Sequence, residues 1–455
     1  MEYISLLMFL VVCGVLLLGF PVAYSLAGTA LIFAGVGLLT GDFESAYLHA
    51  LPSRLYGIVT NQTLIAVPLF VFMGVVLEKS KVAENLLNAM TQLFGQYRGG
   101  LAISVILVGA LLAASTGIVG ATVVTMGLLS LPTMLKQGYA PSFATGTICA
   151  TGTLGQIIPP SIALVLLGDV LSSAYQKAQL NMGIFSPESV SVGDLFVGAI
   201  VPGLLLVSLY LLYVVGVTWF QPSKVPSVAP KASNITVKAL LNALLPPLIL
   251  IFLVLGAILA GFATPTEAAG VGATGALILA LLQKQLTWHK LKDIMLSTTK
   301  VTSMVFMILI GASIFSLVFR GYGGEELIEQ VFNNLPGGVF TAVLLVMLVI
   351  FVLGFILDFI EITFVVVPLV APVLLAMGID PIWLGIMIAV NLQTSFLTPP
   401  FGFALFYLRG VASKSVKTIE MYKGVMPFII IQIMLLIAMA IWPNLITWLP
   451  EILYG

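Results

Sequence analysis

The sequence contains one motif twice, and each copy interrupts an apolar stretch that is long enough to cross a membrane. Residues 151–161 read TGTLGQIIPPS, and residues 391–401 read NLQTSFLTPPF. A proline pair (Pro159 and Pro160, Pro399 and Pro400) breaks a helix, because proline lacks a backbone N–H and clashes with the preceding turn. Lipid cannot hydrogen-bond the freed carbonyls, so such a break must be buried in protein or face a wet cavity. Two breaks in corresponding halves point to the binding site of a secondary transporter.

Composition limits the class of protein. The 455 residues are 60% hydrophobic and 8% charged, whereas soluble domains carry about 25% charged residues. We therefore expect an all-α polytopic membrane protein. The net charge of zero gives no sign of a nucleic-acid partner. Cys13 and Cys149 are too few for a disulfide framework or a zinc site. No lysine follows a glycine, so the phosphate-binding loop of ATPases is absent.

A membrane span needs about 20 apolar residues, and this length sets the expected elements of the first half. The start lacks a basic region, so residues 4–20 are expected to be a retained span rather than a cleaved signal. Residues 101–134 are too few for two crossings and too many for one, which indicates a re-entrant hairpin with its tip at 115–122. The other elements are spans at 22–40, 58–78 and 195–219, an interfacial segment at 42–54, an amphipathic helix at 81–96 and the broken helix at 142–170, which is followed by a polar loop of about 22 residues.

The second half repeats this order after a proline- and lysine-rich linker at 220–238. Its expected elements are spans at 240–260, 264–282, 299–319 and 425–446, an amphipathic piece at 324–334, a hairpin at 338–376 with its tip at 354–363, and the broken helix at 382–408. Gly138, Pro141 and Pro159 each lie 240 positions before a residue of the same type. Five crossings plus one hairpin per half is an odd count, so residues 1–219 and 239–455 should form an inverted repeat.

Basic residues indicate the orientation. With both termini outside, fifteen lysines and arginines fall on the cytoplasmic side, and only Arg54, Lys177 and Arg320 fall outside. This is a strong positive-inside bias. The first hairpin then enters from the cytoplasm and the second from the outside, and their tips should meet near the midplane.

The candidate site follows from these tips and breaks. Helix N-termini at hairpin tips favour anions, and unwound stretches before the proline pairs offer carbonyls to Na⁺. One Na⁺ is expected between 115–122 and 151–156, a second between 354–363 and 391–398, and the substrate carboxylate between the tips. The alternative for each hydroxyl is that it only bonds back to its own helix. Candidate cation ligands are Ser115, Gly117, Gly152, Thr153, Gly155, Gly354, Asp358, Asn391, Thr394 and Thr398, and candidate substrate contacts are Ser115, Thr116, Thr122, Gln156, Thr363, Gln393 and Arg409.

Charged groups within the apolar stretches are functional hypotheses in their own right. Asp358 is expected to ligate a cation or to cap the returning arm of the hairpin. Glu361 is expected to carry a proton or to face water. Arg409 could meet an anionic substrate or extend to the membrane surface.

At these residues the chain resembles the large membrane subunit of the tripartite ATP-independent periplasmic (TRAP) transporters. The resemblance rests on residues 152–161, 262–269 (FATPTEAA), 378–381 (GIDP) and 391–402, and it covers the whole chain. It implies an elevator-type carrier driven by Na⁺, a small four-helix membrane subunit, a periplasmic substrate-binding protein and a place in the bacterial inner membrane. Residues 357–363 (LDFIEIT) resemble the branch for 2-keto acids or mannitol and chloroaromatic compounds, and differ from sialic-acid and C4-dicarboxylate members.

Other functions stay open at this point. A stand-alone divalent-anion/Na⁺ symporter of the same fold would need no partner. An intramembrane enzyme would need a histidine near Asp358 and Glu361, but His49 and His289 lie in predicted loops. A proton-pumping respiratory subunit would need charged residues in the middle of several spans, and these middles are nearly uncharged.

Overall fold

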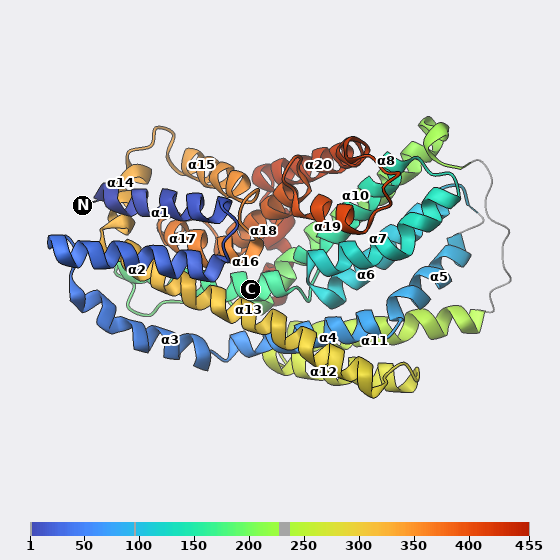
Figure 1. The fold of residues 1–455 in the computed structure, drawn as a ribbon, viewed down its shortest axis with the longest axis horizontal. Helices are drawn as coiled ribbons and strands as arrows, with labels where there is room; N and C mark the ends of the chain where they lie inside the picture. The colour runs from blue at the N-terminus through green and yellow to red at the C-terminus, as the bar shows by residue number, and fades with distance from the viewer. Residues whose placement is uncertain (1, 95–96, 227–236, 455) are drawn as a thin grey trace. The chain divides into compact units, whose positions relative to one another are not determined.

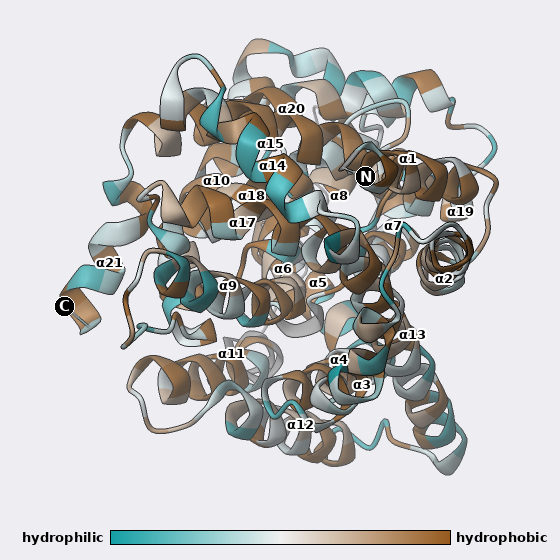
Figure 2. Ribbon diagram, turned by 90° about the vertical axis from the view of Figure 1, so that its left-hand side faces the viewer, coloured by the Kyte–Doolittle hydropathy of each residue, from teal (hydrophilic) through white to brown (hydrophobic). Residues whose placement is uncertain are grey.

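The computed structural model describes residues 2–94, 97–226 and 237–454, apart from the side chains of Glu2, Ser115, Thr116, 237–240, 242 and 243 (Figure 1). Within these ranges every regular element is a helix. Seven described helices are long and apolar enough to cross a membrane, and one bent pair could form an eighth span. The hydrophobic colour runs along the long helices in Figure 2, and the hydrophilic colour gathers in short stretches such as α14. The expected all-α polytopic membrane architecture is confirmed.

The chain divides into two compact units. The first comprises Met1–Ile65, Leu166–Ser191 and Lys300–Gly385. It contains α1 (Glu2–Leu17), α2 (Val22–Thr40), η1 (Ser45–Ala50), α3 (Leu51–Thr60) and most of α9 (Ile162–Asn181) and α13 (Trp288–Gly321), followed by α14 (Gly324–Asn333), α15 (Gly338–Leu353), α16 (Phe359–Glu361), η5 (Ile362–Val366) and α17 (Val367–Ala376).

The second unit comprises Ala66–Val165, Val192–Thr299 and Ile386–Gly455. It contains α4 (Ala66–Lys79), α5 (Val82–Phe94), α6 (Gly100–Thr116), α7 (Val119–Lys136), α8 (Pro141–Thr153), η3 (Leu154–Gln156), α10 (Val192–Phe220), η4 (Pro222–Lys224), α11 (Val237–Leu259), α12 (Pro265–Leu282), most of α18 (Pro381–Leu397), α19 (Phe403–Val411), α20 (Thr418–Ile441) and α21 (Asn444–Tyr454). The units group segments by contact, and the repeat boundaries at 219 and 239 stay a prediction.

The helices are interrupted at the four places where the sequence predicts two hairpin tips and two breaks. The arms α6 and α7 meet at Gly117–Ile118, inside the expected tip. The arm α15 ends at Leu353, and the returning arm begins after Asp358. The first broken helix stops at Gln156 and resumes at Ile162, and the second stops at Leu397 and resumes at Phe403. The proline pairs and the lengths and composition of the apolar stretches therefore located the four interruptions.

The span expected at 58–78 is not one continuous helix, because α3 ends at Thr60 and α4 begins at Ala66; the two form the bent pair that could still make one span. Asn61 explains the break. Its side-chain oxygen accepts the backbone N–H of Thr63 at 2.9 Å, and its amide donates to the Asp169 carboxylate at 3.0 Å. A side chain that bonds to nearby backbone offers the chain an alternative to helical hydrogen bonds.

Three further expectations need correction. The stretch expected as a loop after residue 170 is helical to Asn181, and Gln179 then holds the shortened loop through two 3.0 Å bonds with Glu188 backbone. The span expected at 299–319 begins at Trp288, because Thr287 accepts the N–H of Lys290 and so starts the helix earlier. The last span covers Thr418–Ile441 rather than 425–446, and α21 follows as a separate short helix after Pro443. Part of the predicted linker, 227–236, lies outside the described residues.

Candidate substrate and ion site

The first break is a buried stretch of small and polar residues. Thr151, Thr153 and Gln156 are all at most 2% exposed. After η3 the chain stays non-helical until Ile162, and the Ser161 hydroxyl donates to the Gln156 carbonyl at 2.9 Å. This bond closes the turn and holds the unwound backbone inside the second unit.

The first hairpin packs directly on this break. Gly117 has φ +60°, and a Cβ added there would lie 2.9 Å from the backbone nitrogen of Ile162. A Cβ on Gly155 would lie 3.7 Å from the Ala113 carbonyl oxygen. A Cβ on Gly152 would lie 2.2 Å from Val123 Cγ2, on the other arm. The structure thus brings together the two segments, 115–122 and 151–156, between which a Na⁺ was expected.

The second break joins this site within the same unit. Gln393 Nε2 donates to Thr153 Oγ1 at 3.3 Å, and these two residues are separated by 240 positions, which is the spacing of the repeat. The Tyr210 hydroxyl accepts the Gln432 amide at 2.8 Å and also interacts with the side chains of Gln393 and Thr153. Sequence reasoning missed Tyr210 and Gln432, although a glutamine in the middle of a span is itself a signal.

Three buried amide oxygens, at the first break and in this network, have no hydrogen-bond partner among the described residues. They are Gln156 Oε1, Gln393 Oε1 and Gln432 Oε1. Most buried polar atoms are satisfied, so each exception calls for an explanation. Neutral oxygen atoms are the ligand type that hard cations take. The donor set at the first hairpin and the two breaks therefore fits a small hard cation such as Na⁺.

The predicted hydroxyl ligands bond back to their own helices. Thr153, Thr394 and Thr398 each donate to a carbonyl of the same helix at 2.8 Å. Thr122 donates to the Ile118 carbonyl at 3.1 Å. A hydroxyl that gives its one proton in this way keeps its lone pairs as acceptors. The observed bonds are therefore those of the alternative in which each hydroxyl bonds back to its own helix. They leave the lone pairs of the hydroxyl oxygens free to face a cation.

The second hairpin tip is built on carboxylates. Asp358 Oδ1 accepts the N–H of Phe359 at 2.7 Å, and Glu361 Oε2 accepts the N–H of Asp358 at 2.9 Å. The two form a capping box at the start of the returning arm. Thr363 Oγ1 is buried without a partner among the described residues. Asp358 therefore takes the capping role that the sequence offered as one of two, and cation binding there stays a prediction.

The remaining candidates are placed as follows. Gly354 is buried at the end of α15, and Asn391 is 5% exposed on α18. The segments 354–363 and 391–398 belong to different units, so their pairing stays a prediction. The Arg409 side chain is exposed at the end of α19 and donates to the Val416 carbonyl, which ties down the following loop. The side chains of Ser115 and Thr116 lie outside the described residues.

Comparisons with known proteins identify the family and the fold of the chain. Residues 7–445 match the family described as tripartite ATP-independent periplasmic transporter, DctM component. The chain is 31% identical over 473 positions to the C4-dicarboxylate TRAP transporter large permease protein DctM of Vibrio cholerae, covering 99% of this chain and 98% of that protein. It is 28% identical to the sialic acid TRAP transporter large permease protein SiaM of the same organism, covering 97% of each. A solved structure of the Alcanivorax borkumensis YdaH transporter has a TM-score of 0.61 at 15% identity and covers 88% of each chain, which supports a shared fold.

Proposed function

Since the chain belongs to the tripartite ATP-independent periplasmic transporters as a DctM component, and is thus a large permease subunit and not an enzyme, we propose that it imports an organic acid together with Na⁺. The observation that carries this proposal is the pair of partnerless buried oxygens, Gln156 Oε1 and Gln393 Oε1, beside two helix breaks and one hairpin tip.

Ion coupling follows from the chemistry of these groups. A cation held by the two amide oxygens and the neighbouring threonine oxygens would satisfy atoms that have no hydrogen-bond partner among the described residues. Binding would also tie α8 to α18, because Gln393 already bonds to Thr153 across the two breaks. The organic acid is proposed to bind beside the first hairpin, where α7 begins without a side-chain cap and its N-terminal N–H groups favour a carboxylate.

The substrate is proposed to be a small carboxylate, with 2-keto acids as the class that the sequence around 357–363 favours. The family name and the names of the relatives support a tripartite assembly, in which a periplasmic binding protein delivers the substrate and a small four-helix membrane subunit accompanies this chain. We place the assembly in the bacterial inner membrane with both termini periplasmic, because this orientation gives the positive-inside bias.

We propose transport by an elevator movement, in which both hairpins and both breaks move as one body against the remaining spans. The flanking amphipathic helices support this view. The helix α5 buries Val82, Leu86 and Met90 and packs on α6, the first arm of the first hairpin. The helix α14 contacts α15 and α17 of the second hairpin.

The test is uptake into proteoliposomes that contain the chain with its small subunit. Radiolabelled pyruvate, succinate and sialic acid are each offered with and without the binding protein, and with Na⁺ or choline outside. The proposal predicts uptake of one carboxylate that requires both Na⁺ and the binding protein. Uptake that is indifferent to the binding protein would instead identify a stand-alone symporter, and uptake that survives choline would refute Na⁺ coupling.

A further inference from the structure

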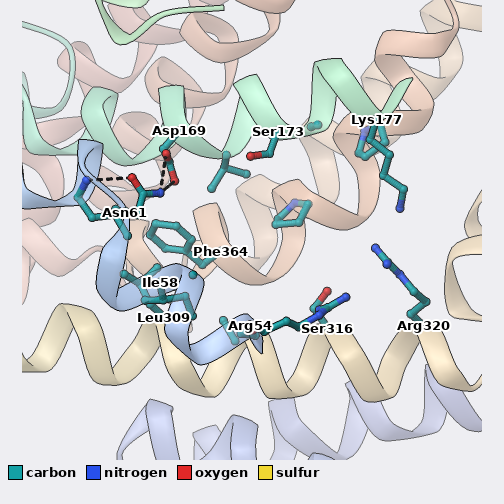
Figure 3. A pocket seen from close by; sticks show the side chains of 18 of the residues that line it. Arg54, Ile58, Asn61, Asp169, Ser173, Lys177, Leu309, Ser316, Arg320 and Phe364 are labelled. Atoms are coloured by element: carbon teal, nitrogen blue, oxygen red, sulfur yellow. Dashed lines mark hydrogen bonds between the residues drawn. The ribbon is translucent and has the colours of Figure 1, made fainter. Parts of the chain in front are cut away.

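A second candidate site lies within the first unit. It is a cavity of about 370 Å³ whose lining comes from α3, α9, α13, α14 and the second hairpin. Figure 3 shows Asn61 and Asp169 at one end, and Lys177 and Arg320 at the other, with Ser173, Ser316 and Phe364 between the ends. The volume falls within the range of about 300–1,000 Å³ that small-molecule sites occupy.

The polar lining of this cavity comes from α9, from α13, and from α3 together with the residue that follows it. The lining residues Asp169, Ser173 and Lys177 are spaced by four along α9. Ser313, Ser316 and Arg320 follow one another by three and four along α13, while Arg54 lies in α3 and Asn61 directly follows the last residue of that helix. Residues three and four apart lie on the same side of a helix. The polar lining of the cavity therefore comes from three segments that are distant in the sequence.

The basic residues of the cavity are not fully neutralised. Glu325 accepts from Lys177 at 2.7 Å and from Arg320 at 3.0 Å. Arg54 is half-buried and forms no hydrogen bond or ion pair with any described residue, and Arg320 Nε is buried without a hydrogen-bond partner in the same ranges. The single carboxylate of Glu325 thus balances only part of the positive charge of Lys177, Arg320 and Arg54. A partly buried, unpaired guanidinium is costly and is satisfied by an anion.

The rest of the lining suits the remaining part of a small organic molecule. The Asp169 carboxylate at the far end is already engaged by the Asn61 amide at 3.0 and 3.2 Å. Phe364, Pro368 and Pro372 are spaced by four on the second hairpin and line the wall. The hydroxyls of Ser173, Ser313 and Ser316 form no hydrogen bond within the described residues and can donate to a bound oxygen atom.

The three basic residues of this cavity share one property that the sequence already shows. Arg54, Lys177 and Arg320 are the only exceptions to the positive-inside bias, and all three line this one cavity. Basic residues on the outer side run against the usual preference, so their convergence indicates a specific use. We propose that this cavity binds the carboxylate of a small organic anion, with Arg54 and Arg320 as its charged contacts. The outer location of the site, as a place where substrate arrives, rests on the proposed function; the binding itself does not.

The test is equilibrium binding to the purified full chain in choline buffer, without Na⁺ and without a binding protein. The probes are radiolabelled succinate and pyruvate, which must bind saturably to the wild type. Arg54→Gln is expected to weaken binding about 10- to 100-fold, because hydrogen bonds to charged groups contribute about 1.5–3 kcal/mol. Arg54→Lys is expected to give an intermediate affinity, because lysine keeps the charge and loses the planar fork of donors.

Arg98→Gln is the matched control, since Arg98 lies in the second unit and donates to the Pro222 carbonyl. It should bind like the wild type. Ser173→Trp, at an exposed position on the lining, should lower binding by filling the cavity. Absence of saturable binding by the wild type, or equal binding by Arg54→Gln and Arg98→Gln, would overturn the proposal. Inorganic phosphate or sulfate that displaces succinate at equal concentration would overturn its carboxylate preference. Because no Na⁺ is present, these outcomes are independent of the uptake test.

Discussion

The two hairpins occupy corresponding places in the two halves of the chain, but their tips are built differently. The first returning arm begins at Val119 after Ile118, whose own side chain forms no capping hydrogen bond. The second begins after Asp358, whose carboxylate caps it while Glu361 closes the capping box. An uncapped helix start leaves N–H groups for a ligand, whereas a capped one has already supplied its own anion.

This difference assigns different tasks to the tips. The first tip is uncharged, is in contact with a break, and lies in the unit that holds the partnerless oxygens of Gln156 and Gln393. It suits a substrate carboxylate and a cation bound by neutral oxygens. The second tip brings two carboxylates, so we expect it to attract a cation and to repel an anion. A symmetric pair of anion sites, one at each tip, is therefore not expected.

The largest effect is expected from Gly117→Ala. Gly117 has φ +60°, and the added Cβ would lie 2.9 Å from the Ile162 nitrogen, so the tip must shift away from the break. A displacement of about 1 Å can lower a rate about 100-fold, and we expect uptake to fall by that order. Gly41→Ala is the control, because Gly41 also has positive φ (+79°) but nothing lies within 4 Å of its added Cβ. An equal loss of uptake in the two variants would show that backbone strain, and not the contact with Ile162, limits transport.

Asp358→Asn separates charge from capping at the second tip. Asparagine caps helices about as well as aspartate, while alanine loses about 1 kcal/mol of stability. If Asp358 also binds a cation, both variants should raise the Na⁺ concentration for half-maximal uptake about 10- to 100-fold, since a charged contact is lost. Only Asp358→Ala should unfold at a lower temperature. A wild-type Na⁺ dependence in Asp358→Asn would leave capping as its whole role.

Gln156→Leu examines the neutral ligands of the first site. Removing a partnerless buried oxygen should leave the free energy of unfolding unchanged or raise it by about 1 kcal/mol. The Na⁺ concentration for half-maximal uptake should nevertheless rise about 3- to 10-fold, the value of one neutral contact. Gln283→Leu is the matched control, because Gln283 Oε1 is also buried without a hydrogen-bond partner among the described residues but lies at the end of α12. A similar rise in both variants would contradict a specific site at the break.

The smallest effect concerns pH and the ion cluster around Glu325 on α14. Burial raises the pKa of Glu325, but its bonds to Lys177 and Arg320 outweigh burial, so the pKa lies below its ordinary value of 4.5. Its stabilisation is thus present above that value and is lost as the pH falls through the lowered pKa. Glu325→Gln should lower stability by about 1 kcal/mol at pH 7 and by nothing in acid. Thermal unfolding at several pH values measures this, and a difference that is the same at every pH would contradict the ion cluster.

The sequence predicted those parts of the molecule that depend on local chemistry. Proline pairs located both breaks, and the small residues of 115–122 located the first tip. It did not predict the interruption at Asn61, because one polar residue in an apolar stretch does not reveal a bond to Asp169, 108 positions away. It identified Arg54, Lys177 and Arg320 as exceptions, but their convergence depends on three helices that are distant in the chain. The network of Tyr210, Gln432, Gln393 and Thr153 escaped prediction for the same reason.

The most direct test of the two unlike tips is equilibrium binding of ²²Na⁺ to the purified full chain. Wild type, Gln156→Leu and Asp358→Asn are compared at pH 7 with choline as the balancing cation. We predict saturable binding by the wild type and weaker binding in both variants, with the larger loss in Asp358→Asn. The double variant should lose more than either single variant, because the two changes act at separate sites. No saturable binding by the wild type, or wild-type binding in both variants, would contradict the account.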